Sequence, residues 1–186
     1  VFTATSTEIS KSLEPLVYTA VSYGRHDEVM AQEQNETFDY DAVQYGLAFH
    51  YALEMMGDFT HASIHAAIES ARKRYGARIG VEKIEIIRSA LENLLCDETF
   101  IVLTRGKHYK EKRFFYKGEM RIIDLLVENG SGDWNVIDYK TGQEENFSHK
   151  MQVKTYMNAV NALAGGTVKG YLCYLNEASV KFVECL

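Results

Sequence analysis

Hydrophobic and polar positions divide the chain into parts with different periods. Residues 1–40 are polar and irregular, and we predict a loosely ordered lead-in there. Over residues 41–97, apolar residues recur every three or four positions, which is typical of helices packed on a core. Breaks near Gly57 and at 76–80 predict three helices in this part.

After Lys112 the period changes to two, or to short apolar runs, which indicates strands. The order is helices, three strands, one helix and two strands, which predicts an α/β (α+β) fold with a mixed sheet flanked by helices. Residues 41–186 are thus predicted to form one domain. The predicted strands are 113–120, 121–127, 134–140, 168–175 and 180–184, and the predicted helix between them is 147–164, ending at Gly165-Gly166.

Composition limits the classes of protein that fit. Hydrophobic residues make up 46% of the chain, which is enough for a buried core. The sequence starts at Val1, with neither a leader nor an apolar run that spans a bilayer, so we expect a fragment of a larger soluble, cytoplasmic protein. The net charge of -6 repels nucleic acid at long range, so any DNA contact must be local or come from other domains.

Cysteines and aromatic residues carry little functional signal. Cys96, Cys173 and Cys185 are scattered without zinc-finger spacing, and we predict reduced thiols in a cytosolic protein. The 12 Tyr and 9 Phe residues follow the strand and helix periods, so they are expected in the core rather than on a base-stacking surface.

Asp138 and Lys140 stand two positions apart on the predicted strand 134–140. Both side chains therefore point to the same face, with Cα atoms about 6.5 Å apart. A symmetric turn centred on Ser131 pairs Asp124 with Asp138 and brings their Cβ atoms to about 5 Å. A bulge in the turn would shift this register by one residue and send Asp124 to the other face.

Two facing carboxylates repel each other unless a cation lies between them. Hard oxygen ligands of this kind suit Mg²⁺ or Mn²⁺. The alternative is that Asp124 and Asp138 are strand-end residues that pair with Lys140 or Arg121 at a solvated sheet edge. The residues alone leave both interpretations open.

Five short motifs follow one another between Asp41 and Val183. They are Gly46-Leu47-Ala48-Phe49-His50 with Ala52-Leu53-Glu54, Glu111 before a strand, Ile123-Asp124-Leu125-Leu126, Trp134-x-Val136-Ile137-Asp138-Tyr139-Lys140-Thr141-Gly142, and His149-x-x-Gln152-x-x-x-Tyr156. In this order they resemble the RecB-like nuclease family within the PD-(D/E)XK superfamily. This domain ends the helicase-nuclease subunits RecB and AddA. The resemblance implies a restriction-endonuclease-like core and phosphodiester hydrolysis.

The resemblance also implies roles for single residues. His50 joins Asp124, Asp138 and the backbone carbonyl of Tyr139 as metal ligands, although a helical histidine by itself is more often a packed or surface residue. Lys140 holds or deprotonates the attacking water, so Asp124, Asp138 and Lys140 are the predicted catalytic residues.

On the helix 147–164, the three- and four-residue spacing places His149, Gln152 and Tyr156 in one stripe, with other residues left for the core. The resemblance assigns Gln152 and Tyr156 of this stripe to the DNA backbone, whereas a solvated polar face explains His149 and Gln152 equally well. Gly46 either lets its helix pack closely on the sheet or is an ordinary helix-start glycine.

The role of Glu111 remains open. It is either a carboxylate that serves the metal site or an exposed charge among basic residues. Three scattered cysteines cannot hold the iron–sulfur cluster that some relatives carry. The resemblance implies a Mg²⁺-dependent deoxyribonuclease of exonuclease type, joined to helicase domains and a second helicase-nuclease subunit, that acts on DNA in double-strand break repair and recombination. The alternative is a catalytically silent member that binds DNA or docks a subunit.

Overall fold

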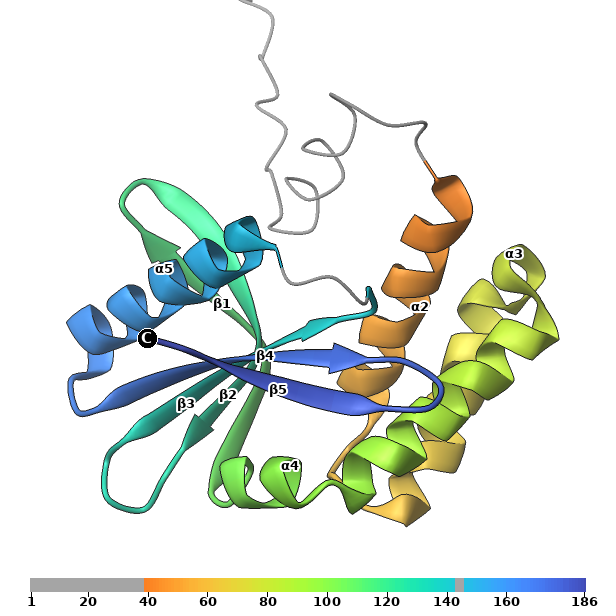
Figure 1. The fold of residues 1–186 in the computed structure, drawn as a ribbon, viewed down its shortest axis with the longest axis horizontal. Coiled ribbons are helices and arrows are strands. Elements are labelled where there is room, and N and C mark those ends of the chain that lie inside the picture. Colours follow the sequence, from red (N-terminus) through yellow and green to blue (C-terminus); the bar gives the residue numbers. More distant parts are fainter. Residues whose placement is uncertain (1–38, 143–145) are drawn as a thin grey trace, which may run out of the picture.

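The computed structural model describes residues 39–142 and 146–186 (Figure 1). The predicted lead-in at 1–40 lies almost wholly outside the described residues. Helices come first, five strands follow, and one helix is inserted between the third and fourth strands. The elements are α2 (Tyr40–Met55), α3 (His61–Cys96), α4 (Glu98–Leu103), β1 (Lys107–Tyr116), β2 (Glu119–Glu128), β3 (Trp134–Lys140), α5 (Phe147–Ala164), β4 (Val168–Leu175) and β5 (Val180–Cys185).

The five strands form one mixed sheet in the order β1-β2-β3-β4-β5. The first three strands are antiparallel neighbours, β3 and β4 are parallel, and β5 returns antiparallel to β4. A parallel pair needs a crossover connection, and α5 supplies it between β3 and β4. The predicted α/β fold, a mixed sheet flanked by helices, is confirmed (Figure 1).

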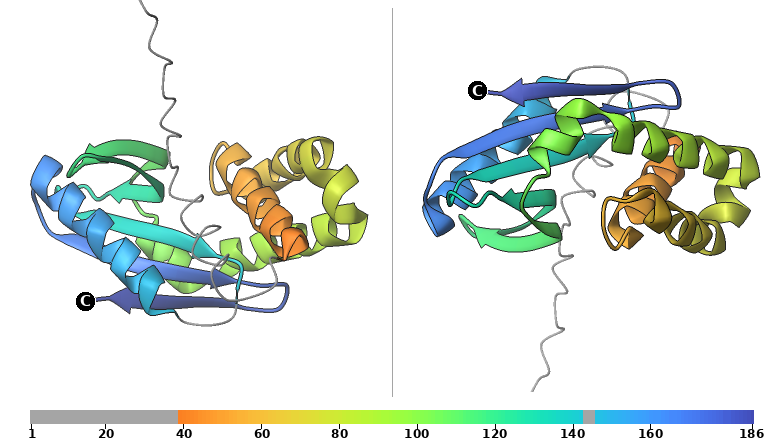
Figure 2. Two further views of the ribbon diagram at one scale, coloured as in Figure 1. Left: turned by 90° about the horizontal axis from the view of Figure 1, so that it is seen from above. Right: turned by 90° about the horizontal axis from the view of Figure 1, so that it is seen from below.

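Helices cover both faces of this sheet (Figure 2). Leu125 and Ile137 point to the face covered by α2 and α3, which we call the α2 face. Leu126 and Val136 point to the opposite face, covered by α5, which we call the α5 face. Neighbouring residues go to opposite faces because side chains alternate along a strand.

The helical part differs from its prediction in two details. α3 is bent at Gly80, whose φ of 82° and ψ of 162° are not helical, so α2 and the two halves of α3 supply the three predicted helices. Glycine takes this positive φ without a side-chain clash. The short helix α4 was missed; it begins after Asp97, whose carboxylate accepts a hydrogen bond from the N–H of Phe100 at 2.8 Å. Among the described helices, none is long and apolar enough to cross a membrane.

The first strand starts earlier than predicted. β1 begins at Lys107 rather than at Arg113, so Glu111 lies inside the strand and not before it. The apolar period did not indicate the first half of β1, because aromatic rings pack there in place of aliphatic side chains. His108 packs on Phe59, and Tyr109 packs near Trp134. The other strands and α5 begin and end within about two residues of their predicted bounds, which is the usual precision of such boundaries.

Candidate metal and catalytic site

The β1–β2 hairpin changes faces at one pair of residues, Glu111 and Asp124. The flanking cross-strand pairs keep one register, so these two residues stand opposite each other. On one side of this point Leu125 packs on the α2 face, whereas Ile123, two positions away, packs on the α5 face. Glu111 has a positive φ of 46°, a conformation that costs a non-glycine residue about 1–3 kcal/mol.

Helix α2 brings His50 to Asp124. The helix begins after Asp39, whose carboxylate accepts the N–H of Ala42 at 3.0 Å, and it buries Phe49 against the sheet. The imidazole Nδ1 of His50 lies 3.4 Å from Oδ2 of Asp124. Only 13% of the His50 side chain and 9% of the Asp124 side chain is exposed. The structure thus brings together two residues that the sequence assigned to one metal.

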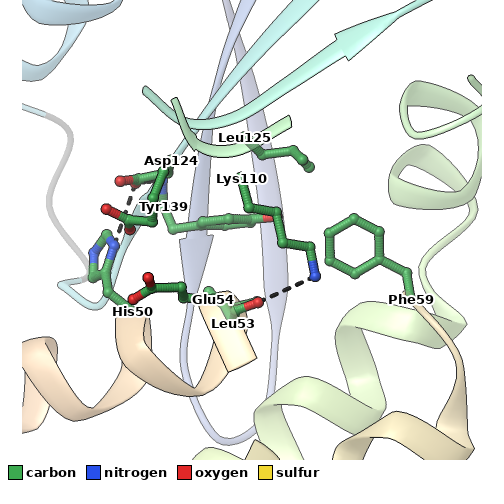
Figure 3. Close-up of a pocket in the computed structure, with 9 residues that line it drawn as sticks. His50, Leu53, Glu54, Phe59, Lys110, Asp124, Leu125 and Tyr139 are labelled. Carbon is green, nitrogen blue, oxygen red and sulfur yellow. Dashed lines mark hydrogen bonds and ion pairs between the residues drawn. The ribbon is translucent and has the colours of Figure 1, made fainter. Parts of the chain in front are cut away.

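His50, Glu111 and Asp124 form a compact cluster among the residues that line a pocket. Figure 3 shows His50 and Asp124 side by side in this pocket. One ligand atom from each residue lies within 4.8 Å of the other two. Oδ2 of Asp124 also accepts the backbone N–H of Tyr139 at 2.9 Å, which fixes the carboxylate at the end of β3. Two carboxylates and one imidazole in half-buried positions form a donor set that suits a divalent cation.

Asp138 and Lys140 lie on the α5 face of β3, and only 2% and 7% of their surfaces are exposed. Nζ of Lys140 is 3.0 Å from Oδ2 of Asp138. The β2–β3 pairs are centred on Ser131 as predicted, and the pair Leu125–Ile137 comes one step before Asp124 and Asp138. Asp138 is paired with Lys140 here, and its role as a metal ligand stays a prediction.

Helix α5 holds Lys140 through two hydrogen bonds in series. Nζ of Lys140 donates to Oε1 of Gln152 at 3.1 Å, and Nε2 of Gln152 donates to the Tyr156 hydroxyl at 2.8 Å. Tyr156 is only 1% exposed and packs on Phe114, so it belongs to the core and not to a polar stripe. Burial, with the charges of Asp138 and Asp124, raises the pKa of the Tyr156 phenol, which therefore stays protonated.

The remaining predicted site residues flank this centre. His149, in the first turn of α5, is half-buried, with Nδ1 3.3 Å from the Tyr174 hydroxyl. The ring of Tyr139 is buried on the α2 face, where burial raises the pKa of its phenol. DNA contacts by His149, Gln152 and Tyr156, and a ligand role for the Tyr139 carbonyl, stay predictions.

Comparison with known proteins places this arrangement in a family. A family model described as the PD-(D/E)XK nuclease superfamily matches residues 21–184, far more than half of the chain. The chain belongs to the PD-(D/E)XK nuclease superfamily. The match does not extend to the narrower RecB and AddA group. No curated protein matches the sequence.

Comparison with solved structures found likenesses at low sequence identity. The crystal structure of a "Putative exonuclease" from Eubacterium rectale is 11% identical, covers 84% of this chain and has a TM-score of 0.54. The chain covers 63% of that protein, and at this identity the likeness shows the fold alone. The crystal structure of SSO0001 is 14% identical, with 86% of this chain and 74% of that chain covered. Its TM-score of 0.32 is too low to indicate a shared fold.

Two residues gain importance from the structure. Glu111, which the sequence left open, belongs to the candidate cluster. Its position could have been found from the two-residue turn Lys117-Gly118, because a hairpin centred there places residue 111 opposite residue 124. Lys110 turns inward and donates to the carbonyls of Leu53 and Met56 at the end of α2. This contact ties the strand that carries Glu111 to the helix that carries His50.

Proposed function

We propose that the chain is a metal-dependent DNA nuclease that hydrolyses phosphodiester bonds. The observation that carries this proposal is the convergence of His50, Glu111 and Asp124 beside the buried Asp138–Lys140 pair. Membership of the nuclease superfamily supports it. In its finer form the proposal is a Mg²⁺-dependent exodeoxyribonuclease, with Mn²⁺ as a substitute, that forms the exonuclease module of a helicase-nuclease in double-strand break repair and recombination.

The cluster fits a divalent cation in both charge and backbone geometry. Glu111 and Asp124 face each other across the hairpin, and a cation between them removes their repulsion. Glu111 adopts an unfavourable φ that brings its carboxylate into the cluster, and strain of this kind is typical of functional sites. We assign the metal to His50, Glu111 and Asp124, with Asp138 and the carbonyl of Tyr139 as further candidate ligands. Bound Mg²⁺ would polarise the phosphoryl oxygens and lower the pKa of an attached water.

Lys140 supplies a positive charge that belongs to the protein itself. Asp138 and Gln152 hold its ammonium group from two sides, at 3.0 and 3.1 Å. In this orientation Lys140 positions the attacking water and offsets the negative charge that grows on the phosphate. Tyr156 fixes Gln152, so it acts on Lys140 through another side chain and is a positioning residue. His149 and Gln152, on the first turns of α5, are the proposed contacts to the DNA backbone.

Helicase domains in the same protein, and a second subunit, are part of this proposal because of the resemblance to helicase-nuclease subunits, and the charge of the chain is consistent with such a tether. A domain with net charge -6 does not concentrate DNA by long-range attraction. Delivery by a tethered motor raises the effective DNA concentration to about millimolar without any new contact. The isolated chain should then bind and cleave DNA weakly compared with its parent protein.

Cleavage of end-labelled linear DNA with Mg²⁺ or Mn²⁺, at low salt, tests the proposal. Asp124→Asn and Glu111→Gln should abolish cleavage and weaken Mn²⁺ binding in calorimetric titration. Glu54→Gln is the matched control, because Glu54 lines the same pocket but lies outside the three-residue cluster. Circular DNA should resist digestion if the enzyme is an exonuclease.

A second set of outcomes would support the silent scaffold instead. In that case DNA binding is measurable, but neither Mg²⁺ nor Mn²⁺ gives cleavage by the chain or by its parent protein. Unchanged Mn²⁺ affinity in both carboxylate variants would remove the metal assignment altogether.

A further inference from the structure

Beyond the face change at Glu111 and Asp124, the β1–β2 hairpin continues as a projecting ribbon (Figure 1). It closes in a two-residue turn, with φ of 50° at Lys117 and 84° at Gly118, which matches a type I′ turn. Such turns follow the natural twist of the strands and give a well-defined tip. The hairpin is therefore a regular element rather than a loose loop.

One face of this ribbon is anchored to the catalytic centre. Phe114 packs against the ring of Tyr156, with ring centroids 5.8 Å apart and nearly perpendicular planes. Tyr156 in turn accepts a hydrogen bond from Gln152, the partner of Lys140. The α5 face of the ribbon is thus fixed by the core, and the opposite face is left for other contacts.

The opposite face presents an apolar cross-strand pair to solvent. Phe115 is paired with Met120, and 67% and 39% of their surfaces are exposed. By strand alternation, Arg113 and its partner Ile122 come next on this face, and the ladder then reaches Glu111 and Asp124. This face therefore runs from an aromatic pair, past an arginine, to the candidate metal cluster.

The charge of the ribbon is opposite to that of the whole chain. Residues 112–121 contain four basic residues and one acidic residue, Glu119, whereas the chain carries a net charge of -6. Arg121 forms an ion pair with Glu119. Lys112, Arg113 and Lys117 are exposed along the ribbon. Of these, Arg113 shares the face of Phe115 and Met120, Lys117 lies in the turn, and Lys112 lies on the other face. A phosphate backbone would meet a local positive charge on this element of an acidic protein.

We propose that this face of the β1–β2 ribbon binds single-stranded DNA and guides it into the nuclease centre, with a base stacked on Phe115 and Met120 and a phosphate held near Arg113. Proteins that bind single strands combine these two features, a basic track and an exposed aromatic ring. Phe115 lies four residues from Glu111, about 13 Å along a strand, which a few nucleotides span. The proposal rests on the proposed function and deepens it, because it names the form of DNA that the centre receives.

The chemistry favours a single strand over other occupants. In duplex DNA the faces of the bases are stacked and closed to Phe115, whereas an unpaired base offers its whole π-face. A protein partner or a second copy of this chain would also cover an apolar pair, and self-association is an outcome of the test below. The single strand is favoured because the same face runs from the aromatic pair past Arg113 to the candidate metal cluster.

Binding of fluorescein-labelled oligothymidine to the full chain, followed by anisotropy in EDTA and low salt, tests the proposal. EDTA removes metal and cleavage, so the result does not depend on hydrolysis. Phe115→Ala should weaken binding about 5- to 100-fold, the range for loss of one stacking platform. Phe115→Tyr should bind as wild type, and Phe115→Leu should resemble Phe115→Ala. Leu163→Ala is the matched control, because Leu163 is equally exposed, at 67%, near the end of α5.

Two further measurements make the test decisive. Duplex binding should change much less than oligothymidine binding in Phe115→Ala. Photo-crosslinking of a bromodeoxyuridine oligonucleotide should label the tryptic peptide 114–117. Wild-type affinity in Phe115→Ala, full affinity in Phe115→Leu, or crosslinks confined to other peptides would overturn the proposal. A change of oligomeric state in Phe115→Ala with unchanged oligothymidine binding would overturn it in favour of self-association.

The outcome is separable from that of the proposed function. Asp124→Asn should retain oligothymidine binding in EDTA even though it should lose cleavage. Strong single-strand binding without any cleavage would support the ribbon and contradict the nuclease. Cleavage by wild type, together with unchanged oligothymidine binding in Phe115→Ala, would support the nuclease and contradict the ribbon.

Discussion

The candidate site has two halves that are stabilised in different ways. In the half formed by α2, β1 and β2, Glu111 and Asp124 face each other, His50 lies beside them, and all three are half-buried. In the half formed by β3 and α5, Asp138 and Lys140 are almost fully buried and neutralise each other. We expect a bound metal ion to neutralise the carboxylates of the first half, whereas in the second half the ammonium group of Lys140 faces Asp138. Metal should therefore control the stability of one half and leave the other unchanged.

Removal of one partner from the buried pair should give the largest loss of stability. Lys140→Met removes the ammonium group that faces the buried carboxylate of Asp138, and breaking a buried ion pair from one side costs about 3–5 kcal/mol. Asp138→Asn combined with Lys140→Met should recover part of this loss, because no isolated charge remains. Urea unfolding in EDTA measures both. Lys154→Met, at an exposed position of α5, is the control.

Loss of activity in a Lys140 variant has two causes to separate, a missing positive charge and an unfolded protein. A Lys140 variant that fails to cleave DNA is informative only if its folded fraction is measured in the same buffer. If Lys140→Met unfolds within about 1 kcal/mol of wild type, the two halves do not differ as described.

Metal should stabilise the other half. Mn²⁺ at a hundred times its dissociation constant should raise the free energy of unfolding by about 2.7 kcal/mol. Glu111→Gln should lose most of this increase, because a neutral amide oxygen is a weaker ligand than a carboxylate for a divalent cation. Thermal unfolding with and without Mn²⁺ decides this. Glu54→Gln should keep the wild-type response, and an equal response in Glu111→Gln would exclude Glu111 as a ligand.

Lys110, which joins β1 to the end of α2, should give the first half an alkaline pH dependence. Burial lowers the pKa of Lys110 to about 8, from about 10.4 in an unfolded chain. Between these values the unfolded chain binds more protons, so stability rises with pH. This group contributes about 1–2 kcal/mol after allowance for its partial exposure.

Comparison of urea unfolding of wild type and Lys110→Met across this pH interval isolates that contribution. The variant should lack the rise, although it also loses the hydrogen bonds to the carbonyls of Leu53 and Met56 and is less stable throughout. Parallel curves for the two proteins would show that Lys110 keeps an ordinary pKa.

The sequence predicted most of the fold because the apolar periods are regular. β3, α5 and β4 have their predicted bounds, and the turn centred on Ser131 has the predicted register. The predicted strand omitted the first half of β1, because that half packs aromatic rings and lysine side chains instead of aliphatic residues. Tyr156 was expected in a polar stripe on α5, but its ring is buried in the core. A tyrosine can bury its ring while its hydroxyl accepts a hydrogen bond, here from Gln152.

The site was predicted less completely than the fold. Proximity of His50 to Asp124 followed from the resemblance, and no periodicity indicated it. Glu111 was left open because its role depends on a positive φ and a change of strand faces, which alternate-residue patterns do not contain. Likewise, Phe115 was expected in the core because period alone does not show that a hairpin extends beyond the helices that cover the sheet.

The smallest expected effect concerns how closely each helix packs on its half of the site. A Cβ at Gly46 of α2 would lie 3.5 Å from Oγ1 of Thr141, which is ordinary contact. Gly46→Ala should therefore stabilise the protein by about 0.5–1 kcal/mol, because alanine is the better helix former. A Cβ at Gly170 of β4 would instead overlap Met157 and Val153 of α5, so Gly170→Ala should cost about 1–3 kcal/mol.

Thermal unfolding of these two alanine variants compares the packing directly. Opposite signs would show that α2 leaves room for a methyl group at position 46, whereas α5 packs tightly on β4 at Gly170. If Gly46→Ala destabilises as much as Gly170→Ala, then Gly46 is needed for close packing of α2 on the sheet. In that case the metal half is as rigid as the half that contains Lys140, and the contrast between the two halves is one of charge alone.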